Sequence, residues 1–278
     1  MGIRLYGDDF TPEQIKRWYE EESEGYANLG GKDKTKYRYG YHEINKLYGF
    51  SKLRSEYFEN VLGFGAAWGY EFEPIIAKIG NLSIIEPSDN LKSARIGKLT
   101  PNYIKPEIYG NLKFADNTFD LITCFSTLHH IPNVSFVVKE LVRVLKPSGY
   151  LLIREPIVSM GDWTVPRGGL TKNERGIPDS FFDKLFKGEP VHVISKEYFW
   201  TGTSFIQRNI DKLLKTPIYS YRIYCIVDKL LSRLLKRNTR YHAEHKLDKF
   251  SPSTVFFVIR KAAFTNKGGY IGYLSDKK

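Results

Sequence analysis

Several features that mark other protein classes are missing from this chain of 278 residues. It has only two cysteines, Cys124 and Cys225, too few for a disulfide framework or a metal cluster. It also lacks a long uncharged apolar run, and its first residues, MGIRLYGDDF, contain no hydrophobic signal-peptide core. Neither a zinc-ligand spacing nor a P-loop is present. We therefore expect no metal site, no stable membrane insertion and a cytoplasmic location.

The composition is that of a well-packed globular protein with an excess of positive charge. Hydrophobic residues make up 42% of the chain and aromatic residues 15%, which is enough for one large α/β domain with an added lobe. The formal net charge is +11, so anionic substrates are favoured and nucleic acid is a possible partner. Many of the basic residues crowd one segment near the C-terminus, namely Lys229, Arg233, Lys236, Arg237 and Arg240.

The middle of the chain alternates between strand-like and helix-like segments. Apolar runs typical of buried strands occur at 57–62, 82–85, 119–124 and 150–153. The segment SFVVKELVRVLKPSG has apolar residues at helical spacing and then a Pro and a Gly that end the helix. This alternation predicts an α/β fold with a doubly wound, mostly parallel sheet, in which ligands bind beyond the carboxyl ends of the strands.

The flanking segments predict four regions in all. Residues 1–56 are expected to form an N-terminal helical cap, in which Thr11 caps the first helix, and residues 57–156 the core. Residues 157–250 interrupt the pattern and predict a substrate lobe inserted before the last strand, with helices near 195–199, 203–214 and 226–235. Residues 251–278 then supply the closing strand, at 253–262, and a tail.

A glycine-rich turn and a later carboxylate indicate a cofactor that contains a nucleoside. The run VLGFGAAWG passes from an apolar strand into small residues, which let the backbone approach a ligand closely. Glu86 follows the next strand, where a carboxylate can bind both hydroxyls of a ribose. These two elements alone do not distinguish a dinucleotide from another nucleoside cofactor.

Three downstream motifs narrow that choice. The chain contains FADNTFDLI, then LHHI, then ELVRVLKPSG, and the region 57–156 that carries them resembles the core of class I S-adenosylmethionine-dependent methyltransferases, of the methyltransferase type 11 kind. The segment SMGDWTVPRGGLTKNERGIP resembles methyltransferases of bacterial polysaccharide gene clusters. The resemblance implies a Rossmann-like methyltransferase sheet and S-adenosyl-L-methionine as cofactor.

The resemblance also implies roles for individual residues. The cofactor-binding positions are Gly63, Gly65, Ala67, Gly69, Glu86, Phe125 and Ser126. His129 is implied to lie near the transferred methyl group. The family usually has an acid where this chain has Gly63 and a glycine where it has Ala67, so a different anchor, weaker binding or lost activity is expected.

Acid–base and substrate-binding residues are predicted with their alternatives left open. A hydroxyl nucleophile needs a base, and the candidates are His129, Glu155, Asp162 and His192, of which His129 leads because it follows a strand end. A structural role at a helix start is the other interpretation of His129. Within the insertion, Trp163, Arg167 and Arg175 are predicted to bind substrate, and a solvated loop braced by salt bridges is the alternative.

The segment IVDKLLSRLLKR has an apolar face and a basic face. Such a helix can lie on an anionic membrane or can pack its apolar stripe on the sheet, and we favour packing.

The predicted function is methyl transfer to a small or medium anionic acceptor, an oxygen of a sugar or glycan precursor. The alternatives are an RNA methyltransferase, favoured by the charge, and a catalytically degenerate binding protein, favoured by Gly63. The sequence does not assign an oligomeric state.

Overall fold

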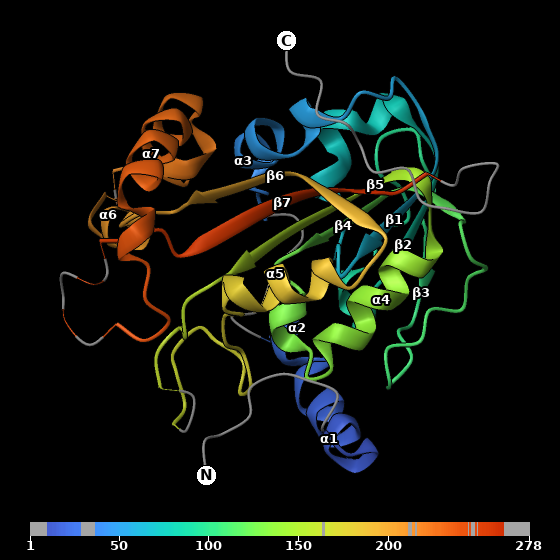
Figure 1. The fold of residues 1–278 in the computed structure, drawn as a ribbon, viewed down its shortest axis with the longest axis horizontal. Coiled ribbons are helices and arrows are strands. Elements are labelled where there is room, and N and C mark those ends of the chain that lie inside the picture. The colour runs from blue at the N-terminus through green and yellow to red at the C-terminus, as the bar shows by residue number, and fades with distance from the viewer. Residues whose placement is uncertain are drawn as a thin grey trace.

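The structure is a computed structural model, and it describes residues 10–28, 37–162, 165–210, 213–214, 216–243, 245, 248 and 250–263. A twisted sheet runs through the centre, with helices on both faces (Figure 1). The strands are β1 (Phe58–Phe64), β2 (Ile79–Ile85), β3 (Asn102–Ile104), β4 (Phe119–Phe125), β5 (Leu145–Pro156), β6 (Val191–Phe199) and β7 (Thr254–Lys261). The helices are α1 (Pro12–Glu22), α2 (Gly25–Asn28), α3 (His42–Tyr48), α4 (Val134–Val144), α5 (Asp179–Lys187), α6 (Thr203–Ile210) and α7 (Arg222–Leu235).

The seven strands lie in the order β3-β2-β1-β4-β5-β7-β6. The strands β3, β2, β1, β4 and β5 are parallel to one another. Strand β7 is antiparallel to both β5 and β6. The predicted doubly wound, mostly parallel sheet is therefore confirmed, and the predicted strand at 253–262 corresponds to β7. In this order the carboxyl ends of β1, β2, β4 and β5 meet at one edge, where a ligand can reach all of them.

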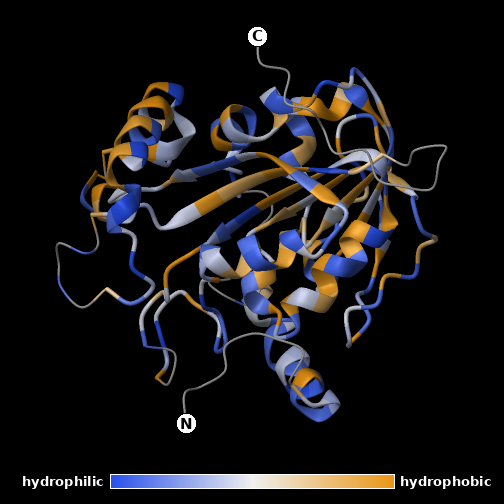
Figure 2. Cartoon of the chain, viewed as in Figure 1, coloured by the Kyte–Doolittle hydropathy of each residue, from blue (hydrophilic) through white to orange (hydrophobic). Residues whose placement is uncertain are grey.

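The core lies in two layers, one on each face of the sheet. On one face, Val137, Leu141 and Val144 of α4 are buried against β4 and β5, together with phenylalanines of α5. On the other face, α3 and the 3-10 helix Tyr70–Lys78 bury Tyr48 and Phe72. Figure 2 shows the apolar stripes of these helices turned toward the sheet. At the chain's start, Thr11 and Gln14 form the predicted capping box of α1.

One local prediction was wrong. The segment 195–199, predicted as a helix, is the end of β6, where Tyr198 pairs with Val255. The segment lacks the regular alternation of apolar and polar residues that predicts a strand, because β6 lies at the sheet edge and is only partly buried. The turn after β1 continues into the 3-10 helix Tyr70–Lys78, which contains Pro74.

Helix α7 packs with the opposite face from the one we predicted. Its buried residues are Cys225, Asp228 and Ser232, whereas its leucines and isoleucines face away from the sheet. Asp228 accepts hydrogen bonds from the backbone N–H groups of Trp200 and Thr201, at 2.6 and 2.8 Å, and these bonds hold the polar face inward. Within the described part of the chain, none of the helices has the length and hydropathy that a membrane span requires.

Candidate active site

A cavity of about 390 Å³ opens at the carboxyl ends of the parallel strands. One part of its wall is the glycine-rich turn after β1 together with Glu86 after β2. Another is the segment Phe125–Thr127 after β4, followed by His129 and His130. Tyr37, Tyr39 and Tyr41 line it from the N-terminal side, and residues 106–108 and 110–112 from the side beyond β3. The predicted site elements therefore converge on one cavity.

The glycine-rich turn has a backbone that few residue types adopt. Gly65 and Gly69 have φ values of +69° and +73°, and a Cβ on Gly65 would come within 2.4 Å of the Thr127 side chain. Ala67, which replaces the glycine usual in the family, also has a positive φ, of 46°. The turn thus keeps a left-handed conformation at a position where a non-glycine residue is strained.

Glu86 connects this turn to the end of β2. Its side chain is buried, and its two carboxylate oxygens accept hydrogen bonds from the backbone N–H groups of Ala67 and Ser88, each at 3.1 Å. Burial raises the pKa of Glu86 to about 7, against the opposing effect of those two hydrogen bonds. A buried carboxylate on the cavity wall can accept further hydrogen bonds from a ligand's hydroxyls.

Gly63 has no room for the acid that the family usually carries there. A Cβ on Gly63 would lie 2.7 Å from the Cβ of Ala66 and 2.9 Å from the ring of Phe72. A different acid, Glu71, lies on the wall of the same cavity and accepts a hydrogen bond from the Thr123 hydroxyl. Burial raises the pKa of Glu71 to about 7. No local sequence pattern points to Glu71, because its position depends on how the 3-10 helix approaches β4.

A buried cation faces the same part of the cavity. Arg154, at the end of β5, is 3% exposed and donates from Nη1 to the Asn45 side chain at 2.8 Å. Its guanidinium group also stacks on the Tyr41 ring, with 4.2 Å between the guanidinium carbon and the ring centroid. The positive charge of Arg154 lowers the pKa of Glu71 and so opposes part of the rise that burial causes. Arg154 and Glu71 therefore place a buried positive and a buried negative group on the cavity wall, in addition to Glu86.

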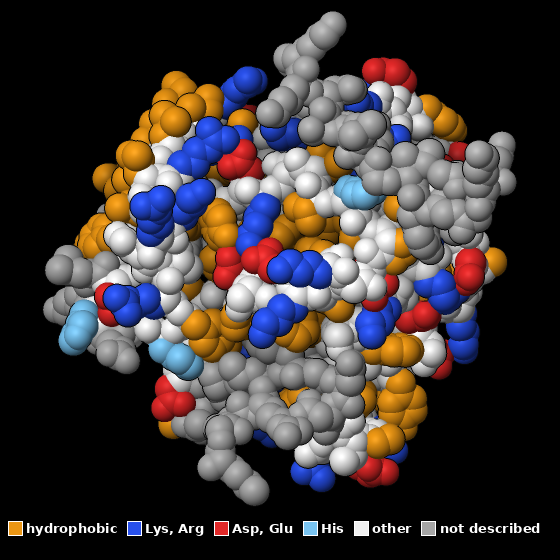
Figure 3. Space-filling view, viewed as in Figure 1, with side chains coloured by type: hydrophobic (Ala, Val, Ile, Leu, Met, Phe, Trp, Pro, Cys, Tyr) orange, Lys and Arg blue, Asp and Glu red, His pale blue; other side chains and the backbone are white. Residues whose placement is uncertain are grey.

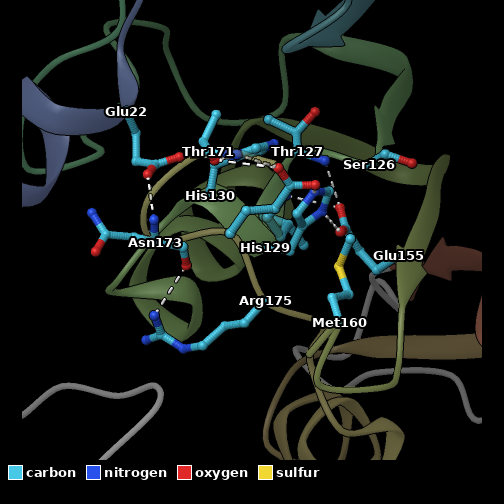
Figure 4. Close-up of polar contacts among 12 residues, drawn as sticks. Glu22, Ser126, Thr127, His129, His130, Glu155, Met160, Thr171, Asn173 and Arg175 are labelled. Carbon is cyan, nitrogen blue, oxygen red and sulfur yellow. Dashed lines mark hydrogen bonds and ion pairs between the residues drawn. The ribbon is translucent and has the colours of Figure 1, made fainter. Parts of the chain in front are cut away.

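His129 is held between the carboxylates of Glu155 and Glu174, and Figure 4 shows Glu155 beside the imidazole. Its Nδ1 lies 2.6 Å from Glu155 Oε2, and its Nε2 lies 3.4 Å from Glu174 Oε1. The other oxygen of Glu155 accepts from the backbone N–H groups of Thr127 and Leu128, both at 2.8 Å, so this carboxylate is fixed. Burial acts to lower the pKa of His129, but the charges and hydrogen bonds of Glu155 and Glu174 outweigh it and raise the pKa to about 9.

His130 joins distant parts of the chain. Its Nδ1 lies 2.9 Å from Glu22 Oε2, and Glu22 Oε1 accepts from the backbone N–H of Asn173 at 2.7 Å (Figure 4). One ligand atom from each of His129, His130 and Glu174 falls within 4.8 Å of the others, a spacing that could hold a metal ion. These side chains already form ion pairs with one another and with Glu22 and Glu155, so we interpret the group as an ion-paired network.

The other predicted residues that the structure describes are not among those lining the cavity. Trp163 falls outside the described residues. Arg167 donates to the backbone oxygens of Met160, Thr171 and Lys172, while Arg175 stacks on Trp18 and donates to the backbone oxygen of Asn173. Asp162 and His192, the other candidate bases, are also not among the residues lining the cavity. Substrate binding by Trp163, Arg167 and Arg175 stays a prediction.

Comparison with known proteins gives a family match for the central region. Residues 62–153 match a family model described as a methyltransferase domain. The demethylmenaquinone methyltransferase of Bacillus licheniformis is 34% identical over 92 residues, which are 32% of this chain and 39% of that protein. The demethylmenaquinone methyltransferase of Bacillus cereus is 30% identical over 95 residues, 32% of this chain and 40% of that protein. The matched region thus spans about two fifths of the length of these curated relatives.

Solved structures resemble the whole chain in fold. The [4+2]-cyclase SpnF aligns with a TM-score of 0.56 and 12% identity, covering 93% of this chain and 99% of that one. A chain of the complex between the Haloferax volcanii Trm112 methyltransferase activator and a methyltransferase aligns with a TM-score of 0.53 and 12% identity, covering 90% and 98%. At such low identity the likeness concerns the fold alone. The fold of SpnF, which is named as a [4+2]-cyclase, resembles that of this chain, so the fold by itself does not assign a reaction.

Proposed function

We propose that this chain, whose residues 62–153 form a methyltransferase domain of the class I fold, transfers a methyl group from S-adenosyl-L-methionine to an acceptor bound in the same cavity. The observation that carries the proposal is Glu86. It is a buried carboxylate at the end of β2, fixed by the glycine-rich turn and turned toward the cavity. A group in that position suits the two hydroxyls of a ribose.

The residues around Glu86 fit the other end of the cofactor. The amino-acid end of S-adenosylmethionine carries an ammonium group and a carboxylate. Glu71 and Arg154 offer a buried negative and a buried positive group on the same wall. We propose that Glu71 binds the ammonium group in place of the acid absent at Gly63, and that Arg154 binds the carboxylate. The glycine-rich turn and the backbone at Phe125 and Ser126 would border the cofactor between these ends.

The acceptor would be an oxygen of a small or medium sugar or glycan precursor, placed next to His129. The cofactor would supply an activated methyl group to that oxygen, and a neutral His129 would accept the hydroxyl proton at Nε2. Glu155 would hold the imidazole in the required orientation through Nδ1. The Nε2–Glu174 distance of 3.4 Å is longer than a normal hydrogen bond, which would let a hydroxyl approach Nε2. Because the pKa of His129 is about 9, the neutral form predominates only above that pH.

Calorimetry with S-adenosylmethionine and with S-adenosylhomocysteine tests the proposal. The wild-type chain should bind both, and Glu86→Ala should weaken binding about 100-fold or more, because two hydrogen bonds to a charged group are lost. Glu56→Ala, which removes an exposed carboxylate far from the cavity, should leave the affinity unchanged.

Two results would contradict the proposal in different ways. A folded wild-type protein that binds neither compound would exclude a cofactor-dependent reaction. Equal affinity for the wild type and Glu86→Ala would refute the ribose assignment alone.

A further inference from the structure

Exposed apolar side chains gather on one part of the surface. Of the sixteen large hydrophobic side chains exposed in the described part of the chain, ten lie between residues 205 and 250. We call this the α6–α7 surface, and its members are Phe205, Leu213, Tyr221, Ile223, Ile226, Val227, Leu230, Leu231, Leu234 and Phe250. The hydrophobic atoms at the upper left of Figure 3, where α7 lies, belong to this region. An apolar patch of this kind marks an interaction surface.

The helical spacing makes the patch continuous along α7. Ile223, Val227, Leu230 and Leu234 follow one another at three or four residues and therefore share one face of the helix. Ile223 and Leu234 are each 79% exposed, so this face touches almost nothing in the described structure. The opposite face is tied down by Asp228, which fixes the orientation of α7. The apolar face is therefore turned outward by the fold itself.

Positive charge surrounds the same surface. Residues 203–243 contain nine Lys or Arg residues and two Asp residues, and one of those two, Asp228, is buried. Arg208, Arg222, Lys236 and Arg237 are exposed and make no ion pair with any described residue. An apolar helix face flanked by unpaired cations is typical of helices that lie in the interface of an anionic membrane.

We propose that the α6–α7 surface docks onto an anionic lipid bilayer, with α7 lying parallel to the membrane plane. A second copy of this chain fits the surface less well. Pairing α7 with its own copy would bring Arg222, Lys236 and Arg237 close to the same cations of the other molecule, with no described acid to offset them. Anionic lipid headgroups supply the charge that these residues lack.

The segment just before α7 contacts the cavity wall. Tyr219, just before α7, stacks on Tyr41 at 5.0 Å and contacts Trp200 at 5.3 Å between ring centroids, and both partners line the cavity. Docking would therefore hold the cavity wall near the bilayer, where an acceptor carried on a lipid could enter. This last consequence rests on the proposed function, whereas the docking itself does not.

Sedimentation with vesicles tests the docking without any cofactor. The untagged chain should bind phosphatidylcholine vesicles that contain phosphatidylglycerol, bind pure phosphatidylcholine vesicles weakly, and dissociate as salt is added. The triple variant Ile223→Gln, Leu230→Gln, Leu234→Gln should bind at least tenfold more weakly, because three apolar side chains no longer enter the interface.

A charge variant and a matched control complete the test. Changing Arg208 and Arg222 to Gln should weaken binding at low salt by about fivefold per charge. The control replaces three exposed apolar residues elsewhere, as Tyr57→Gln, Val165→Gln and Ile194→Gln, and should bind like the wild type.

Several outcomes would overturn the proposal. One is a folded chain that does not bind the anionic vesicles, and another is a helix variant that binds as the control does. A third is a chain that sediments as a dimer, releases monomers in the helix variant and ignores vesicles, because the surface would then be a contact between two copies. Cofactor binding measured on the same preparations would show separately whether the proposed methyl transfer fails.

Discussion

In most folded proteins charged side chains are exposed and large apolar side chains are buried. The cavity wall and helix α7 both depart from this rule, but in opposite ways. The cavity wall buries charges, in Glu71, Glu86 and Arg154, whereas α7 exposes its isoleucines and leucines to solvent. Burying a charge costs free energy unless a partner compensates it, and an exposed apolar stripe gains free energy only when something covers it. The two proposals above assign each region a partner from outside the chain, a polar ligand for the cavity and an apolar layer for α7.

Removing the buried charge of Glu71 should change the stability strongly, and the change should depend on pH. The pKa of Glu71 is about 7 in the folded chain and 4.5 in a model peptide. Below pH 4.5 both states hold the proton and there is no penalty. The folded state then loses stability as pH rises, and the loss is complete above pH 7, where it amounts to about 3 kcal/mol. Glu71→Gln should therefore be more stable than the wild type by up to about 3 kcal/mol at pH 8.

Chemical denaturation at pH 4 and pH 8 measures this effect. The two proteins should be alike at pH 4, and Glu56→Gln should match the wild type at both pH values. In calorimetry, the affinity of the wild type for S-adenosylmethionine should fall below pH 7 as Glu71 gains its proton, whereas that of Glu71→Gln should be low throughout. Equal stabilities at pH 8 would mean that Glu71 is not a buried charge.

A smaller effect is expected for two histidines that both lie beside carboxylates but have pKa values shifted in opposite directions. Glu155 and Glu174 raise the pKa of the buried His129 to about 9, whereas burial lowers the pKa of His42 although Glu73 lies 3.0 Å away. NMR titration of the histidine ring protons should show one residue above pH 8 and the other below its usual 6.5.

Glu155→Gln is the variant that tests the cause. It should lower the pKa of His129 by more than one unit, because one of the two charges that favour the imidazolium is gone. The pKa of His42 should not change. A His129 that titrates near 6.5 in the wild type would show that the two carboxylates do not control it.

The smallest effect is expected for the exposed face of α7. The triple variant Ile223→Gln, Leu230→Gln, Leu234→Gln should change the free energy of unfolding by less than about 1 kcal/mol, because these side chains contact little. Leu141→Ala, in the buried face of α4, should cost about 2–5 kcal/mol. Denaturant unfolding measures both variants. If the α7 variant lost as much unfolding free energy as Leu141→Ala, the exposed face of α7 would be packed as closely as the buried face of α4.

The sequence predicts the parallel strands and the turns at their carboxyl ends better than the insertion. Apolar runs identify the parallel strands β1, β2, β4 and β5 and the antiparallel strand β7, because strands covered on both faces of a sheet are almost continuously hydrophobic. The glycine-rich turn and Glu86 follow from local chemistry at strand ends. Edge strand β6 gives no such signal, since half-buried positions accept polar and apolar residues alike.

Residues brought together by tertiary contacts could not be predicted. Glu22 meets His130 across 108 positions of sequence, and no local pattern links the two. The periodicity of α7 predicts an amphipathic helix but not which face turns inward. Asp228 decides that, through bonds to the backbone of a segment 27 and 28 positions away.

The position of β7 has a consequence for how the chain folds as it is made. Among the described strands, β6 pairs only with β7, which is synthesised more than fifty residues later and also has to fill the place beside β5. Until residues 254–261 emerge, β5 has an open edge and β6 has nothing to pair with. The parallel half of the sheet can assemble early, while the strand and helices of the insertion wait for the last strand. Slow synthesis between β6 and β7 would therefore prolong the time in which an unpaired edge is exposed to other chains.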